Sequence, residues 1–272
     1  MATMRGPSHT GAMPDVELAL VGGPTVVIGY AGLTLLTDPT FDPPGEYGNL
    51  TKLTGPAFGP EHIGHVHVVL LSHDEHPDNL DRAGRALLEG AGHVLSTPGA
   101  SSRVPGVVGL KPWHSITLYG AHAPVCVTAV PAQHGPTEMR DRLAEVTGFV
   151  VSAAGWPTLY FSGDNAEVEV AAAVAHHFPD VEIVLQCAGA ARVARLDNAL
   201  LTADAARTLA IADLWPAATV VPVHVDDWAH FSEPRAVFRR AVEGDPARDR
   251  IVLLERGAAV RVPRAWSAPA HA

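Results

Sequence analysis

Two imidazoles and several carboxylates follow an apolar run in segment 70–81 of this sequence, which reads Leu-Leu-Ser-His-Asp-Glu-His-Pro-Asp-Asn-Leu-Asp. The run itself, residues 66–71, is nearly continuously apolar, which is typical of a strand buried on both faces. Imidazole and carboxylate groups at the end of such a strand are suited to binding a divalent metal ion. The candidate ligands in this segment are His73, His76 and Asp78, with Asp74 and Glu75 as alternatives for the first position.

Similar side chains follow other apolar runs farther along the chain. His134, Asp164 and His224 each come just after a strand-like segment, and Asp38 closes an early one. The carboxyl ends of strands form the edge at which open α/β sheets gather their ligands. Because five separate strands each deliver an imidazole or a carboxylate there, the sequence predicts one metal site built from distant segments.

The elements that must position these side chains alternate between strands and helices. Residues 16–21, 25–30 and 33–37 read as an antiparallel meander broken by Gly and Pro turns, and residues 79–89 as a helix closed by Gly90. We expect further strands at 93–96, 115–119, 125–130, 148–152, 158–162, 181–186, 219–223 and 251–254, and helices at 165–178, 203–214 and 234–242. Several strands followed by helices, twice over, predict two packed sheets with helices outside.

Length and composition favour one large α/β domain. The chain has 272 residues, 47% of them hydrophobic, enough to bury a sizeable core. We expect that domain to span residues 15–264, with disordered tails at 1–14 and 265–272. The sequence contains neither a secretion signal nor an apolar run of membrane-spanning length, and Cys126 and Cys187 form no paired motif. These features predict a cytoplasmic protein.

The charge balance narrows the class of partner. The formal net charge is −10, from 19 basic and 29 acidic residues. Nucleic acid and anionic membrane surfaces both require a basic face, so we expect neither as a partner. The glycines do not form a phosphate-binding loop, which argues against a nucleotide cofactor. A small-molecule substrate is the favoured partner, and a homo-oligomer stays open.

With these residues in view, the sequence resembles the metallo-β-lactamase superfamily over most of its length. The resemblance is carried by Thr37-Asp38-Pro39, the cluster from Ser72 to Asp81, Gln133-His134-Gly135, Ser162-Gly163-Asp164 and Pro222-Val223-His224. It implies the family's α/β fold, a four-layer αβ/βα sandwich. The early Thr-Asp-Pro and the late histidine followed by Trp228 and Phe231 look most similar to the branch of the ascorbate-6-phosphate lactonase.

The resemblance also implies an activity, a metal and a role for each residue. It implies a hydrolase in which a metal-bound hydroxide attacks a lactone, ester, amide or phosphoester. It also implies one or two bound divalent ions, with Zn²⁺ as the favoured metal and Mn²⁺ or Fe²⁺ as alternatives. His73, His76 and His134 would form the first metal position, Asp78 and His224 the second, and Asp164 would bridge them. Asp78 would also orient the nucleophile or return a proton, and His230 is the candidate proton donor or substrate ligand. Asp38 is expected to accept a hydrogen bond from a ligand imidazole.

This sequence departs from the family signature at two places. The signature is His-x-His-x-Asp-His, whereas this chain has His-x-x-His-x-Asp-Asn, with Asn79 last. Asparagine is at best a weak ligand, which predicts a depleted second metal position. Two other classes of function therefore stay open. The first is a different reaction on the same fold, catalysed by a single-metal lyase or isomerase or by a redox-active iron enzyme. The second is a catalytically degraded scaffold that only binds metal.

The remaining polar candidates have more ordinary interpretations. We expect the pairs His65 and His67, and His176 and His177, to be structural, and Cys187 to be a buried inert thiol. Asn165 is suited to capping the helix that follows Asp164. Lys52 and Arg192 are the candidate cations if the substrate is anionic.

Overall fold

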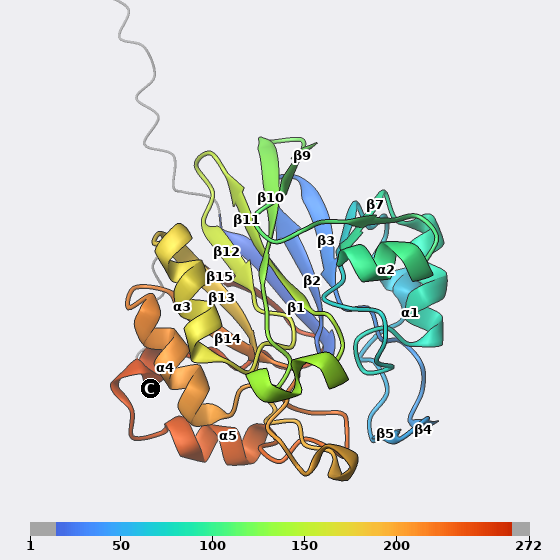
Figure 1. Ribbon diagram of the computed structural model, residues 1–272. Helices are drawn as coiled ribbons and strands as arrows, with labels where there is room; N and C mark the ends of the chain where they lie inside the picture. The colour runs from blue at the N-terminus through green and yellow to red at the C-terminus, as the bar shows by residue number, and fades with distance from the viewer. Residues whose placement is uncertain (1–14, 263–272) are drawn as a thin grey trace, which may run out of the picture.

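The computed structural model describes residues 15–262, which form two mixed β-sheets that face each other (Figure 1). The predicted disordered tails, residues 1–14 and 265–272, lie outside the described residues, and a single domain over 15–264 stays a prediction. Seven strands make the first sheet and six make the second, and a two-stranded hairpin lies apart from both.

The first sheet begins with the predicted meander. Strands β1 (Val16–Gly22), β2 (Thr25–Tyr30) and β3 (Leu33–Thr37) pair antiparallel. Next to β3, the strands run parallel in the order β6 (Val68–Leu70), β7 (His93–Ser96) and β8 (Val107–Gly109). The last strand within residues 15–262, β15 (Ala259–Val262), pairs antiparallel with the free edge of β1.

The second sheet has the same division into an antiparallel and a parallel part. Its strand order is β14, β13, β12, β11, β10, β9, and the first three are parallel to one another. The bounds are β9 (Ser115–Tyr119), β10 (Pro124–Pro131), β11 (Thr147–Ala153), β12 (Thr158–Phe161), β13 (Val181–Cys187) and β14 (Thr219–Val223). Because β10, β12 and β14 each end just before a candidate ligand, this sheet delivers three of them to one edge.

Helices cover the outer faces of both sheets. Helices α1 (Arg82–Leu87) and α2 (Pro98–Arg103) lie on the first sheet, and α3 (Val168–His177), α4 (Ala205–Leu214) and α5 (Arg235–Val242) lie on the second, as Figure 1 shows. The largest apolar cluster fills the space between the sheets, and two others lie under the helices. This arrangement confirms the predicted four-layer αβ/βα sandwich.

Some predicted elements were wrong in extent or kind. Residues 251–254 do not form a strand: Ile251 makes a single bridge to Val220, and β15 supplies the edge strand instead. The helix expected from residue 79 begins at Arg82, where Asp81 accepts a hydrogen bond from the Gly84 amide at 2.8 Å. The helix expected from residue 165 begins only at Val168.

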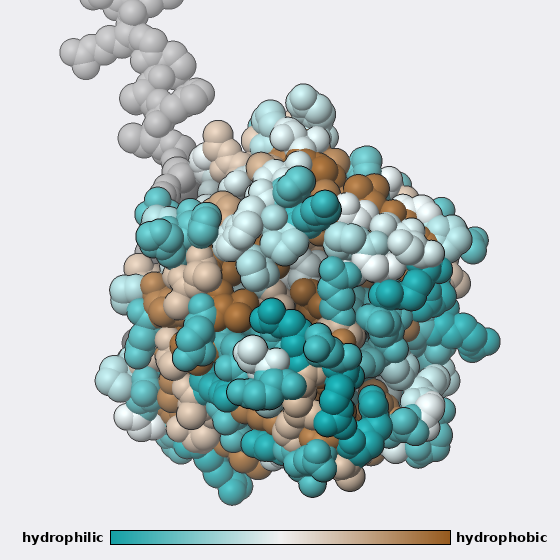
Figure 2. Space-filling view, viewed as in Figure 1, coloured by the Kyte–Doolittle hydropathy of each residue, from teal (hydrophilic) through white to brown (hydrophobic). Residues whose placement is uncertain are grey.

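The connection after β3 carries a short hairpin, β4 (Gly45–Tyr47) and β5 (Leu50–Lys52), and five 3₁₀ turns complete the secondary structure. The turns are η1 (Pro60–His62), η2 (Leu88–Gly90), η3 (Thr137–Arg142), η4 (Ala194–Leu196) and η5 (Pro246–Arg250). No helix within the described residues 15–262 has the length and apolar character to cross a bilayer. In Figure 2, hydrophobic residues reach the surface in separate patches among hydrophilic ones.

Candidate metal centre

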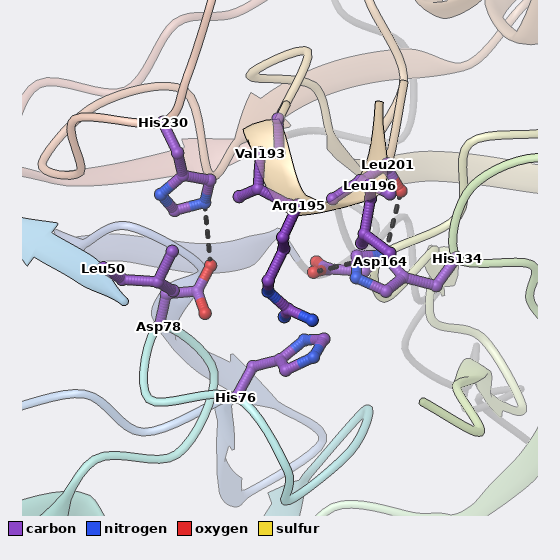
Figure 3. A pocket seen from close by; sticks show the side chains of 11 residues that line it. Leu50, His76, Asp78, His134, Asp164, Val193, Arg195, Leu196, Leu201 and His230 are labelled. Atoms are coloured by element: carbon purple, nitrogen blue, oxygen red, sulfur yellow. Dashed lines mark hydrogen bonds and ion pairs between the residues drawn. The ribbon is translucent and has the colours of Figure 1, made fainter. Parts of the chain in front are cut away.

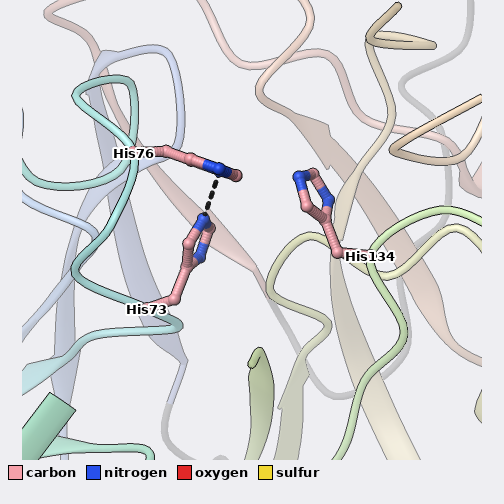
Figure 4. A group of neighbouring side chains, drawn as sticks. All are labelled: His73, His76 and His134. Atoms are coloured by element: carbon pink, nitrogen blue, oxygen red, sulfur yellow. Dashed lines mark hydrogen bonds between the residues drawn. The ribbon is translucent and has the colours of Figure 1, made fainter. Parts of the chain in front are cut away.

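His73, His76 and His134 form a first triad of imidazoles (Figure 4). His73 Nε2 lies 2.9 Å from His76 Nδ1, and the His134 ring centroid lies 5.6 Å from that of His73 and 5.1 Å from that of His76. Burial lowers the pKa of His73 well below its usual range, and it lowers the pKa of His134 as well. Neutral imidazole is the form that binds a metal ion, so His73 and His134 are in the form that can accept one.

The extra residue between His73 and His76 is taken up by a bend at Asp74 and Glu75. Arg103 holds this bend from outside, with its Nη2 2.5 Å from Asp74 Oδ1 and 3.2 Å from Glu75 Oε2. Both carboxylates therefore point to Arg103, and neither belongs to the triad. Of the alternatives for the first position, the structure brings only His73 into the cluster.

His73 is oriented by a buried chain of hydrogen bonds that starts at Asp38. Ser72 donates from its backbone N–H to Asp38 Oδ1 at 2.6 Å and from its hydroxyl to Asp38 Oδ2 at 2.7 Å. Since that hydroxyl proton is used, Ser72 Oγ accepts from His73 Nδ1–H at 2.9 Å, which leaves the lone pair of His73 on Nε2, facing the triad. Asp38 thus acts through Ser72, whereas direct acceptance from an imidazole was expected.

A second triad, Asp78, Asp164 and His224, lies beside the first and is fully buried. His224 Nε2 is 3.4 Å from Asp78 Oδ2 and 3.6 Å from Asp164 Oδ1. Burial alone would raise the pKa of Asp78, but His224 and His230 outweigh it and hold that pKa well below its usual range. Burial alone would lower the pKa of His224, but Asp164 and Asp78 reverse the effect and raise it. Without a cation, this triad therefore keeps a proton on His224.

Close backbone packing fixes Asp164, the member of the second triad that also faces His134 of the first. Gly163 has φ +54°, and a Cβ there would lie 2.5 Å from the Thr147 carbonyl oxygen and 2.8 Å from Ser72 Cβ, so only glycine fits. The next residue, Asn165, does not cap α3 as expected. Its side-chain oxygen accepts a hydrogen bond from the backbone N–H of Gln133 at 3.0 Å. This bond connects the segment after β12 to the segment after β10, which carries His134.

The backbone of His224 is held in the left-handed region, with φ 57°. Its N–H donates to the Gly23 carbonyl at 2.9 Å, which fixes the turn after β14 against the β1–β2 turn. A non-glycine residue in this region costs about 1–3 kcal/mol and persists where the surroundings over-determine it. The imidazole is consequently directed into the second triad, and both of its ring nitrogens are buried without a hydrogen-bond partner in the described chain.

Asn79 stands where the family signature has its last histidine. Its amide nitrogen donates to Asp38 Oδ2 at 3.0 Å and to Asp164 Oδ1 at 3.2 Å. The side chain is completely buried and turns its donors toward these two carboxylates. Asn79 therefore links the hydrogen-bond chain behind His73 to the second triad.

A pocket opens over both triads, and His230 stands at its wall (Figure 3). His230 Nε2 lies 3.1 Å from Asp78 Oδ2, and its Nδ1 has no hydrogen-bond partner among the described residues. On the opposite side, His134 Nδ1–H donates to the Leu201 carbonyl at 2.9 Å, so its Nε2 lone pair is free. The pocket is lined by Leu50, His76, Asp78, His134, Asp164, Ala191, Val193, Arg195, Leu196, Leu201 and His230.

Comparison with known families agrees with this architecture. A family model described as "Beta-lactamase superfamily domain" matches residues 34–225. The chain belongs to the metallo-β-lactamase superfamily. Membership confirms the predicted family, and the finer likeness to the ascorbate-6-phosphate lactonase branch stays a prediction. Among curated proteins, no significant sequence match was found.

Solved structures of similar fold cover nearly the whole chain of this superfamily member. An isothiocyanate hydrolase from Delia radicum gut bacteria is 21% identical, with TM-score 0.76 over 93% of this chain and 99% of its own. A possible metal-dependent hydrolase from Veillonella parvula is 17% identical, with TM-score 0.78 over 92% and 100%. CmlA, a diiron β-hydroxylase from Streptomyces venezuelae, is 18% identical, with TM-score 0.63 over 93% of this chain and 55% of its own.

Other histidines and the buried cysteine lie outside this metallo-β-lactamase site. His65 and His67 stack edge-on at 4.7 Å, and His67 Nδ1 accepts from the Thr34 amide at 3.0 Å. His177 stacks on Trp113 at 4.0 Å. Cys187 is fully buried, and burial raises the pKa of its thiol well above the usual range. The sequence analysis did not identify the role of Ser72 in orienting His73, although Ser72 directly precedes that histidine. It also did not identify Arg195 as a residue of the pocket.

Proposed function

We propose that this protein is a metal-dependent hydrolase of small organic substrates, such as lactones, esters, amides or phosphoesters. The observation that carries the proposal is the meeting of two ligand triads at the floor of one pocket. The hydrolases of similar fold, from Delia radicum gut bacteria and from Veillonella parvula, support it. The cytoplasm is the compartment that we expect for this activity.

The donors fit one or two divalent cations. His73, His76 and His134 would hold one ion, and Asp78, Asp164 and His224 would hold a second. Three of the buried atoms in these triads have no hydrogen-bond partner among residues 15–262: Asp78 Oδ1 and both ring nitrogens of His224. Buried polar atoms normally have a partner, and a bound cation would supply one here. When bound, such cations supply an activated water near neutral pH and polarise the scissile group.

Asp78 and His230 are suited to handling the proton of the leaving group. Asp78 Oδ2 lies 3.1 Å from His230 Nε2, and the pKa of Asp78 is held well below its usual range, so an ionised carboxylate faces the imidazole. Both side chains line the pocket, where the imidazole of His230 lies beside the carboxylate of Asp78 (Figure 3). His230 would donate its proton to the leaving group, and Asp78 would hold the ring in position.

The first experiment measures bound metal and turnover together. Protein purified without added metal is analysed for its metal content and then assayed with lactones, esters, amides and phosphodiesters in Zn²⁺, Mn²⁺ or Fe²⁺. We expect up to two ions per chain and hydrolysis of at least one substrate class. The double variant His134→Ala, Asp164→Ala should lose both, and the exposed His176→Ala serves as the matched control. Full turnover in the double variant, or no bound metal after supplementation, would overturn the proposal.

A second variant tests the proton donor separately from the metal. His230→Gln keeps the size of the side chain and a hydrogen-bonding group but cannot become a cation. We expect kcat to fall by about 10²–10⁴-fold, the usual contribution of a general acid, with metal content unchanged. Loss of metal in this variant would show instead that His230 is a ligand.

The metal content also separates the proposal from its alternatives. A single ion with lyase or isomerase turnover would favour the single-metal reaction. Iron with oxygen-dependent turnover would favour redox chemistry, as in the diiron β-hydroxylase of similar fold. The degraded scaffold is the outcome if metal binds and no substrate is turned over.

A further inference from the structure

One cation enters the pocket without a partner of its own. Arg195 lies on the 3₁₀ turn η4, and in Figure 3 its side chain descends between Asp78 and Asp164 and ends beside the His76 ring. Within residues 15–262, it makes no hydrogen bond or ion pair. Arg195 is an exposed residue that lines the pocket, so its guanidinium is left to interact with whatever the pocket binds.

The two cations named from the sequence are used elsewhere. Lys52 is buried, pairs with Asp81 at 3.2 Å and lies 5.5 Å from the centroid of the Trp228 ring. Arg192 is exposed and donates to the Asn198 carbonyl at 2.7 Å. Neither of these two candidates lines the pocket over the triads.

The segment that carries Arg195 is fixed at both ends. The Arg192 amide donates to the His230 carbonyl at 2.9 Å, and the Ala191 amide donates to the Thr202 hydroxyl at 3.0 Å. Between them, the side chain of Leu196 is buried in an apolar cluster with Trp228 and Phe231. Arg195 therefore projects from a turn that is anchored to the loop of His230, which keeps the guanidinium over the metal centre.

The rest of the pocket wall is apolar. The apolar residues that line it are Leu50, Ala191, Val193, Leu196 and Leu201. The two carboxylates of the lining, Asp78 and Asp164, already face histidines. The pocket thus combines an apolar wall, a metal centre and one free guanidinium, whose planar fork of donors matches a carboxylate or phosphate.

We propose that Arg195 binds an anionic oxygen group of the substrate, so that the preferred substrates carry a carboxylate or phosphate on a short apolar body beside the bond that is cleaved. The inference rests on the proposed function, because the metal centre defines where that bond lies. It assigns the specificity for charge to the β13–α4 loop, whereas the strand ends supply the reaction chemistry.

Binding of two matched hydroxamates to the zinc-loaded protein tests the inference. Pentanohydroxamate and the monohydroxamate of glutaric acid share a metal-binding head and five carbons, and they differ in a terminal carboxylate. We expect calorimetry to show that the wild-type protein binds the glutaric compound about tenfold more tightly, because a hydrogen bond to a charged group contributes at least about that factor in affinity. Arg195→Gln should remove the preference, Arg195→Lys should keep part of it, and the control Arg192→Gln should keep all of it.

The outcomes separate this inference from the proposed function. Equal affinities in the wild-type protein, or a preference that survives in Arg195→Gln, would overturn the role of Arg195 while leaving the metal centre intact. If the wild-type protein bound neither zinc nor either hydroxamate, the proposed function would fail, and the inference would fail with it. Replacing the terminal carboxylate of the glutaric compound with a phosphonate, and measuring its affinity in the same way, then shows which of the two anionic groups Arg195 binds more tightly.

Discussion

The two triads of the candidate metal centre offer a cation very different surroundings. His73, His76 and His134 are three imidazoles, and burial keeps His73 and His134 neutral. Asp78, Asp164 and His224 combine two carboxylates with an imidazole whose pKa those carboxylates raise. Imidazole suits zinc, whereas carboxylate oxygen suits harder cations such as manganese. We therefore expect the two positions to differ in metal preference and in whether an entering metal must displace a proton.

Asp164→Asn should have the largest effect, because Asp164 faces both triads. Its Oδ1 is 3.6 Å from His224 Nε2, and its Oδ2 is 3.9 Å from His134 Nδ1. We expect turnover to fall by about 10²–10⁴-fold, as for loss of a group that acts in the transition state, and one metal equivalent to be lost. Kinetics and metal analysis check this, with the exposed Asp180→Asn as control. Near-normal turnover would mean that the triads do not work as one centre.

Removing an imidazole from the first triad and a carboxylate from the second should have opposite effects on metal preference. His76→Ala should weaken zinc binding more than manganese binding, because it removes an imidazole, and Asp78→Ala should weaken manganese binding more than zinc binding, because it removes a carboxylate. Each loss should exceed the roughly 10- to 100-fold that removal of an outer hydrogen-bond partner costs. Competitive metal titration measures both variants. The same pattern of losses in both would show that the triads are not distinct sites.

Asn79→Ala tests the link between the triads. Without the amide, Asp38 and Asp164 each lose one donor, and we expect metal affinity to fall by about 10- to 100-fold with the ligands still present. Titration of the variant against the exposed Asn49→Ala gives the comparison. If affinity were unchanged, Asn79 would only fill space in the place of the signature histidine.

The pH dependence of metal binding should show the smallest effect. His224 carries a raised pKa, so a metal entering the second triad must displace its proton, and affinity there should fall by up to about tenfold per pH unit below that pKa. In the first triad, the pKa values of His73 and His134 are lowered by burial, so these two ligands should release few protons to an entering metal until the pH falls well below 6.5. Calorimetry in buffers of different ionisation enthalpy counts the released protons. Equal proton release at both positions would contradict the assignment.

The strand ends that carry the candidate ligands could be predicted, because an apolar run in the sequence marks where a buried strand ends. The apolar runs before His134, Asp164 and His224 end where β10, β12 and β14 end, within one or a few residues. Strand β15 could not be predicted in this way, because four residues have little periodicity and pair only where β1 leaves an edge open.

Other parts of the site depended on backbone geometry that composition does not specify. Arg195 reaches the pocket because the following residues, Asp197 and Asn198, both adopt left-handed conformations, which turn the chain sharply after η4. The bend at Asp74 and Glu75 depends on Arg103, which is 29 residues away from Asp74 in the sequence. Such long-range partners decide which of several adjacent polar residues faces inward.

Each triad takes its members from both sheets, since the residues after β6 meet those after β10, β12 and β14. A bound cation would therefore act as a crosslink between the two halves of the sandwich, across sequence separations of up to about 150 residues. Such a link stabilises the native state by mass action and must break before the sheets can separate. Chelation should accordingly hasten unfolding and proteolysis of this protein, which would make metal supply a control on its lifetime as well as on its activity.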